Sequence, residues 1–132
     1  MIVRLPAVLR EAMVRLARAA APREACGLLV GVVQEETMTV SGLAPSRNLA
    51  REDDAFEIDS ALHLALQRRL RGRGESVIGV WHSHTSGAAV PSLRDAAGAW
   101  QKGLAWLITA GEETSGWVAR GDGFDPVEVL VA

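Results

Sequence analysis

The sequence is poor in cysteine and has no long apolar run. Cys26 is the only cysteine among 132 residues, so the chain cannot form an internal disulfide, and a reducing compartment is expected. A cysteine-rich structural zinc site is excluded for the same reason. No segment approaches the roughly 20 apolar residues that span a bilayer, and the N-terminus lacks the pattern of a secretory signal. We therefore expect a cytoplasmic protein without a membrane partner.

An excess of positive charge is also missing. The chain carries 14 basic and 16 acidic residues, which gives a net charge of -2, so a broad basic surface for nucleic acid is not expected. A hydrophobic fraction of 48% and a charged fraction of 23% are typical of globular proteins. A chain of this length can bury a core without disulfides, and we expect one domain spanning 1–132.

The order of apolar patterns predicts an α/β fold with a mixed, curved sheet flanked by about three helices. Helical spacing extends over 5–21, over a segment that begins at 59 or 60 and ends before Gly72, and over 92–102. Strand patterns occupy 25–33 and 37–43, which predict a hairpin, and then 55–58, 77–84, 104–110, 117–120 and 127–131.

Two histidines follow the apolar run at 77–81. Successive side chains of a strand point to opposite faces, so His82 and His84 are expected on the same face, where they can converge on one ion. Past a short loop, Asp95 stands where a helix would begin and can supply a carboxylate to that ion. Three protein ligands are typical of catalytic zinc sites, in which water keeps the fourth position and has a pKa of about 7.

Each part of this pattern also has a simpler explanation. Ser92 and Asp95 fit a capping box, in which a serine and an acidic residue three positions later bind free amide groups at a helix start. His63 lies on a predicted helix and is typical of a packing or solvated residue, so we leave it outside the site. Cys26 lies in an apolar segment and is typical of a small buried residue. The combination of two same-face histidines, a short loop and an acidic helix start nevertheless favours metal binding.

The spacing of these residues resembles the signature of a known family. The His-Ser-His element at 82–84, followed by seven residues, Ser92, two more residues and Asp95, resembles the motif of the JAMM (MPN-plus) zinc metallopeptidases. The segment 22–31 is similar to the stretch in which that family places its catalytic glutamate, and this similarity selects Glu24. The resemblance implies an MPN/JAMM-like, cytidine-deaminase-like fold for essentially the whole chain.

The resemblance also implies a set of roles. One zinc ion per chain would be held by His82, His84 and Asp95, and Glu24 would take a proton from the bound water. Ser92 would then steady the oxyanion that develops on the substrate. A positioned carboxylate typically contributes 10²–10⁴-fold to such a reaction, and one hydroxyl donor roughly 3 kcal/mol.

The substrate class follows from the resemblance and from the small size of the chain. Relatives that cut polyubiquitin carry long insertions, whereas 132 residues are similar to the small prokaryotic members. The implied reaction is hydrolysis of a peptide or isopeptide bond after the C-terminal glycine of a ubiquitin-like or sulfur-carrier protein. The resemblance is also compatible with a homodimer. Thr85 departs from the family, since many relatives have proline there, and the loop from Thr85 to Val90 is expected to be small and flexible.

Two other function classes were weighed. A non-catalytic MPN scaffold or assembly module typically lacks the metal ligands, and all five motif residues are present here. A zinc deaminase acting on nucleobases requires a His-x-Glu element and a Pro-Cys-x-x-Cys pair, which a chain with one cysteine does not contain.

Overall fold

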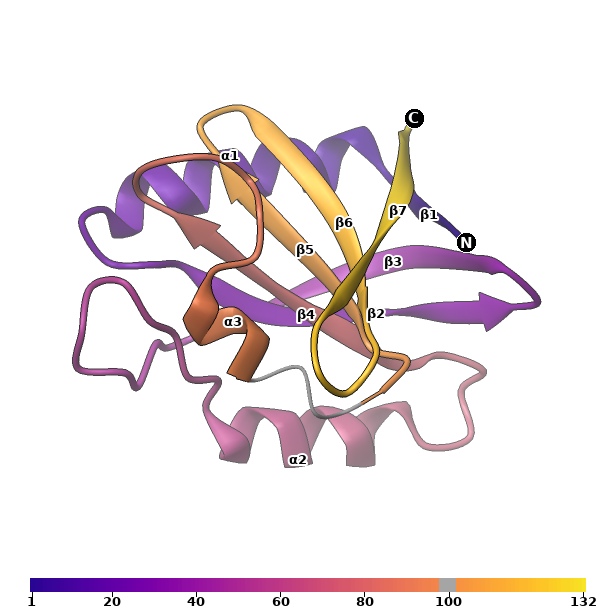
Figure 1. Ribbon diagram of the computed structural model, residues 1–132. Coiled ribbons are helices and arrows are strands. Elements are labelled where there is room, and N and C mark those ends of the chain that lie inside the picture. Colours follow the sequence, from indigo (N-terminus) through magenta and orange to yellow (C-terminus); the bar gives the residue numbers. More distant parts are fainter. Residues whose placement is uncertain (98–101) are drawn as a thin grey trace.

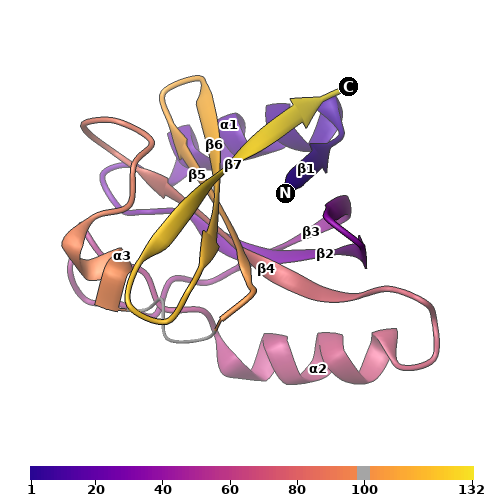
Figure 2. The same cartoon turned by 45° about the vertical axis from the view of Figure 1, so that its right-hand side comes forward.

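The computed structural model describes residues 1–97 and 102–132, and their seven strands close into a barrel (Figure 1). The strand order is β1-β3-β2-β4-β5-β6-β7. The strands are β1 (Ile2–Leu5), β2 (Cys26–Gln34), β3 (Thr37–Ser46), β4 (Ser76–His84), β5 (Ala105–Ala110), β6 (Glu113–Ala119) and β7 (Phe124–Val131). The helices are α1 (Ala7–Ala20), α2 (Ser60–Leu70) and α3 (Leu93–Ala97). Helices α1 and α2 lie on opposite sides of the barrel in both views (Figures 1 and 2).

The sheet is mixed, as predicted. β1 pairs in parallel with both β3 and β7, and β4 pairs in parallel with β5, whereas the other neighbours are antiparallel. The predicted α/β class with a mixed sheet flanked by helices is therefore confirmed. Closure of the sheet was not predicted, because it depends on β1. The sequence pattern placed Leu5 in the first helix, but Leu5 ends β1, and the helix begins after Pro6, whose ψ of 137° is extended.

Helix α1 covers one end of the barrel interior. Its alanine and leucine residues are strong helix formers, and it buries Met13 completely while Leu9 and Leu16 pack on the core. Helix α2 begins at an N-cap, because the side chain of Asp59 accepts a hydrogen bond from the amide of Ala61 at 3.0 Å. The buried core under α1 consists of Val3, Leu5, Met13, Leu29, Met38, Val40, Ile78, Trp81, Ala105 and Leu107.

Two predicted elements differ from the structure. The strand expected at 55–58 is reduced to a single bridge between Asn48 and Ile58. The side chain of Asn48 binds the Ala55 carbonyl and the Glu57 amide, which a paired strand would have used for its ladder. The helix expected at 92–102 contains α3, its continuation falls on 98–101, outside the described residues, and Lys102 lies in a turn.

Strand β4 brings the histidines to the centre of the sheet, between β2 and β5. Its close approach to β5 requires a glycine, because a Cβ on Gly79 would collide with the carbonyl oxygen of Ala105. On the other side, Cys26 of β2 is opposite His82. Two residues further along this antiparallel register, Glu24 comes opposite His84.

Among the described residues, no helix is long and apolar enough to cross a membrane.

Candidate metal centre

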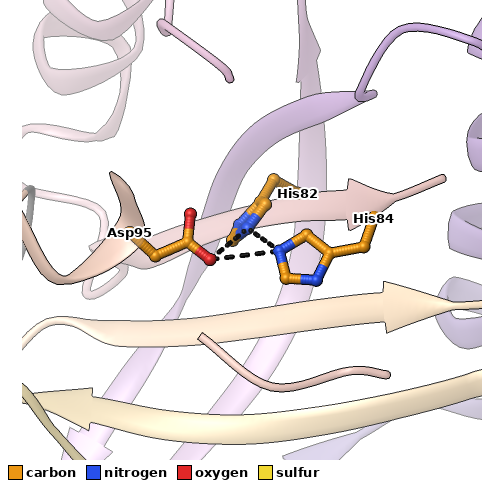
Figure 3. A group of neighbouring side chains, drawn as sticks. All are labelled: His82, His84 and Asp95. Carbon is orange, nitrogen blue, oxygen red and sulfur yellow. Dashed lines mark hydrogen bonds and ion pairs between the residues drawn. The ribbon is translucent and has the colours of Figure 1, made fainter. Parts of the chain in front are cut away.

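The side chains of His82, His84 and Asp95 converge on one point (Figure 3). The Nε2 atoms of the two histidines lie 3.1 Å apart, and the Asp95 Oδ2 atom lies 3.2 Å from His82 Nε2 and 3.1 Å from His84 Nε2. In a tetrahedral zinc site with bonds of about 2.0 Å, two ligand atoms are about 3.3 Å apart. The three atoms are thus spaced like one face of such a tetrahedron, and this donor set fits zinc.

The loop between β4 and α3 orients two of these groups. The Nδ1 atom of His84 lies 3.1 Å from the carbonyl oxygen of Ala88, to which it can only donate, so in the neutral ring the lone pair is on Nε2 and faces the other two side chains. The Ser92 amide donates to Asp95 Oδ2 at 2.9 Å, and the Asp95 amide donates to Ser92 Oγ at 3.1 Å. Both hydrogen bonds belong to the capping box, so the cap and the ligand geometry are compatible.

Aromatic packing holds His82 in place. Its ring is fully buried, stacks on Phe56 with centroids 4.3 Å apart, and meets the edge of Trp106 at 5.6 Å. Its Nδ1 atom is buried and has no hydrogen-bond partner within residues 1–97 and 102–132. Sequence reasoning missed Phe56, because a single aromatic residue in a polar segment gives no signal of its three-dimensional neighbour.

Burial and mutual hydrogen bonds set the charge states of the three groups. Burial would raise the pKa of Asp95, but hydrogen bonds from His82 and His84 outweigh burial and hold this pKa well below its usual range. Burial lowers the pKa of His82, although Asp95 opposes the effect. The hydrogen bond to Asp95 raises the pKa of His84. The carboxylate is therefore ionised and His82 neutral, as metal ligands must be, whereas the interaction with Asp95 favours the protonated form of His84.

Glu24 lies beside this cluster, two residues before β2. The Ser83 amide donates to the Ala25 carbonyl at 3.0 Å, and the Ala25 amide donates to Ser83 Oγ at 2.8 Å, so this end of β2 is tied to β4. The Glu24 side chain is only 6% exposed, and its Oε1 atom is buried without a hydrogen-bond partner in the described part of the chain. Burial raises the pKa of Glu24 to about 7, partly offset by the charge of His84. A carboxyl with such a pKa can both accept and release a proton near neutral pH.

An open cavity of about 520 Å³ adjoins the cluster and is lined by Glu24, His84 and Ser92 among others. Two exposed apolar side chains lie in the segment that leads into and begins α3: Val90 is 53% exposed and Leu93 is 93% exposed. In the same lining, Arg94 lies 3.8 Å from Asp54, and it also lies 4.0 Å from Glu52. The cavity thus combines a buried acid, a hydroxyl group and an apolar rim.

The loop from Thr85 to Val90 is anchored in its second half. Ala89 is 1% exposed, and its carbonyl oxygen accepts a hydrogen bond from Ser115 of β6, whose hydroxyl in turn accepts one from Trp117. His63 lies on α2 and is not part of the cluster. Cys26 is buried, and burial raises the pKa of its thiol to about 11, which makes it unreactive at neutral pH.

The comparisons with known proteins agree with this geometry. The family model described as prokaryotic homologs of the JAB domain matches residues 6–121. The chain is 32% identical over 88 residues to the desampylase of Haloferax volcanii, a match that covers 66% of this chain and 62% of that protein. It is 34% identical over 85 residues to the CysO-cysteine peptidase of Mycobacterium tuberculosis, covering 64% of this chain and 57% of that protein. The matches thus span about three fifths of these relatives.

Solved structures share the fold. The solution structure of a Desulfitobacterium hafniense protein matches with a TM-score of 0.87 and 30% identity, over 100% of this chain and 93% of that chain. A JAB1/MPN domain protein from Archaeoglobus fulgidus matches with a TM-score of 0.62 and 19% identity, over 98% of this chain and 99% of that chain. The predicted MPN/JAMM-like fold is therefore confirmed.

Proposed function

Because the chain belongs to the prokaryotic homologs of the JAB domain, the small prokaryotic JAMM type, we propose that it is a zinc-dependent peptidase or isopeptidase. Its substrate would be the bond after the C-terminal glycine of a ubiquitin-like or sulfur-carrier protein. The observation that carries the proposal is the triangle of His82, His84 and Asp95 donor atoms, 3.1 to 3.2 Å apart, beside the buried Glu24, whose Oε1 atom has no hydrogen-bond partner among the described residues.

Zinc held by His82, His84 and Asp95 would supply an activated water and a Lewis acid that polarises the scissile carbonyl. The other steps belong to side chains of the chain itself. Glu24 takes the proton of the attacking water on its carboxylate and then delivers it to the leaving amine, for which a pKa near neutrality is suited.

Ser92 is proposed to stabilise the charge that develops on the substrate oxygen. The Ser92 Oγ atom accepts a hydrogen bond from the Asp95 amide, so its own hydrogen is left to donate into the cavity that it lines. A hydroxyl donor aimed at a developing oxyanion typically contributes roughly 3 kcal/mol. The capping role and the catalytic role therefore use different parts of the same hydroxyl group.

The substrate class is supported by the names of two relatives, a desampylase and a CysO-cysteine peptidase. The site has features suited to an extended protein tail. Its cavity is open, the exposed side chain of Leu93 offers apolar contact next to Ser92 in its lining, and the exposed Val90 precedes them in the chain. We propose that the tail of the carrier enters along this rim, with its glycine carbonyl directed toward the cluster.

The proposal is tested with purified protein and a carrier that ends in Gly-Gly fused to cysteine or to a peptide. We expect about one zinc per chain by elemental analysis, cleavage after the last glycine by mass spectrometry, and loss of cleavage in EDTA. The Glu24→Ala variant should keep zinc and lose turnover, whereas Glu36→Ala, at an exposed glutamate before β3, should behave like the parent.

Two results would contradict the proposal. A fully active Glu24→Ala protein would refute the assigned mechanism. A protein that binds no zinc and ignores EDTA would favour the alternative function, a non-catalytic scaffold or assembly module.

A further inference from the structure

The side chain of Asn48 uses its full hydrogen-bonding capacity. Its amide nitrogen donates to the carbonyl oxygens of Glu24 at 3.0 Å and Ala55 at 2.9 Å, and its Oδ1 atom accepts from the amides of Ala50 at 2.9 Å and Glu57 at 3.0 Å. A carboxamide has two N–H donors and two oxygen lone pairs, so all four positions are occupied. Because each partner can act only as donor or only as acceptor, the orientation of the amide is fixed.

These hydrogen bonds reach two parts of the candidate site, the backbone around Phe56 and the backbone of Glu24. Ala55 and Glu57 flank Phe56 in the chain, so two of the four bonds hold the backbone on either side of the ring that stacks on His82. A third bond holds the backbone of Glu24 itself. One side chain therefore connects the backbone of Glu24, the proposed general base, with the backbone around Phe56, whose ring stacks on His82.

Attachment of this segment to the barrel does not depend on Asn48 alone. The guanidinium group of Arg23 donates to the carbonyl oxygens of Asn48 and Ala50, and the Leu49 amide donates to the Glu57 carbonyl at 3.0 Å. The Leu49 contact holds only the Glu57 side of Phe56, whereas the Asn48 side chain also holds Ala55 on the other side and the Glu24 carbonyl. The Asn48 side chain is thus not what attaches the segment to the barrel. Its specific contribution is to fix the position of Glu24 relative to Phe56.

We propose, resting on the function proposed above, that Asn48 is a positioning residue that sets the general base Glu24 and the metal ligand His82 relative to each other. It acts on His82 through the stacked ring of Phe56 and on Glu24 through its backbone carbonyl. The ligand of the site is a divalent cation. Metal affinity therefore tests the effect of Asn48 on His82, and turnover tests its effect on Glu24.

The test uses Asn48→Asp, which is nearly isosteric. This variant keeps an oxygen for the Ala50 and Glu57 amides but replaces the donor to the Glu24 and Ala55 carbonyls with a second oxygen. An added negative charge by itself attracts a cation and strengthens zinc binding. Weaker zinc binding in Asn48→Asp therefore has the opposite sign from the charge effect and reports loss of positioning.

Zinc affinity is measured by competition with a chelator, and turnover by steady-state kinetics of the zinc-loaded protein. We expect the zinc dissociation constant of Asn48→Asp to rise by about tenfold or more and kcat to fall by a similar factor, with KM nearly unchanged, as is typical for residues that orient metal ligands. In a Phe56→Leu background, Asn48→Asp should no longer weaken zinc binding, because only the charge effect remains, but it should still lower kcat.

The matched control is Ser46→Ala. Ser46 Oγ accepts the Asp59 amide at 2.9 Å in the same segment but contacts neither Glu24 nor Phe56, so this variant should keep zinc affinity and kcat. A folded Asn48→Asp protein with parental zinc affinity and kcat overturns the inference, and so does an equal loss of affinity in Ser46→Ala. If no carrier is cleaved by any variant, the proposed function fails, while the zinc measurements still decide the effect of Asn48 on His82.

Discussion

Replacing Glu24 with glutamine should stabilise the metal-free protein at alkaline pH while abolishing turnover. The carboxyl is 6% exposed and one of its oxygens has no partner in the described part of the chain, so ionisation inside the fold is unfavourable. Its pKa is raised by burial from 4.5 to about 7. The stability that accompanies the neutral form is therefore fully present below pH 4.5 and is lost as the pH rises through 7.

The magnitude follows from the two pKa values. They differ by about 2.5, and each pH unit corresponds to about 1.4 kcal/mol, so ionising Glu24 in the fold costs about 3 kcal/mol at high pH. Glutamine has nearly the same shape and no charge to bury. The advantage of Glu24→Gln over the parent should grow by about 2.5 kcal/mol between pH 5 and pH 8.5.

The assay is urea unfolding of both proteins in EDTA at these two pH values, followed by circular dichroism. EDTA matters because a bound cation would stabilise the ionised carboxylate and cancel the effect. Titrating groups away from this position change stability equally in both proteins, so the comparison isolates Glu24 together with its charge interaction with His84. A stability difference between the two proteins that is the same at pH 5 and pH 8.5 would refute the reasoning.

Two further substitutions separate catalysis from substrate binding. Ser92→Ala should lower kcat by about 100-fold with zinc retained, and should cost about 1 kcal/mol of stability from the lost cap; kinetics, elemental analysis and urea unfolding measure the three effects, and an unchanged kcat would remove Ser92 from the mechanism. Leu93→Asp should raise KM for the carrier by about tenfold or more without changing the melting temperature, because the side chain is 93% exposed and has apolar surface to bury only when substrate binds. Val8→Asp, at a 66% exposed position of α1, is the matched control and should leave KM unchanged, and equal effects of both substitutions would count against the proposed rim.

Local patterns in the sequence were sufficient to predict the parts of the site that are close together in the chain. Strand alternation places His82 and His84 on one face, and the helix start places Asp95 near them, because each relation depends on only a few residues. The structure brings all three together, with Glu24 and Ser92 on the adjoining cavity. Glu24 was selected only by a family resemblance, since its position opposite His84 depends on the pairing of β2 with β4.

The features that the sequence did not predict depend on contacts between distant segments. β1 is only four residues long and precedes a proline, yet it pairs with β3 and β7 and closes the barrel. The strand expected at 55–58 fails because the side chain of Asn48 competes for its backbone groups, a contact that no periodicity reveals. The stacking of Phe56 on His82 was not predicted either, because the same segment of the chain positions the Phe56 ring.

The separation of the site residues along the chain has a consequence for the order of folding. His82 and Asp95 are 13 residues apart, whereas the contact between Ala25 and Ser83 that brings Glu24 into place joins residues 58 apart. Closing the longer loop costs about 1.3 kcal/mol more in chain entropy than closing the shorter one. The segment from β4 to α3 can therefore bring His82, His84 and Asp95 together before β2 pairs with β4. The three candidate ligands thus belong to one local unit, whereas Glu24 reaches them only when the distant strand pairs.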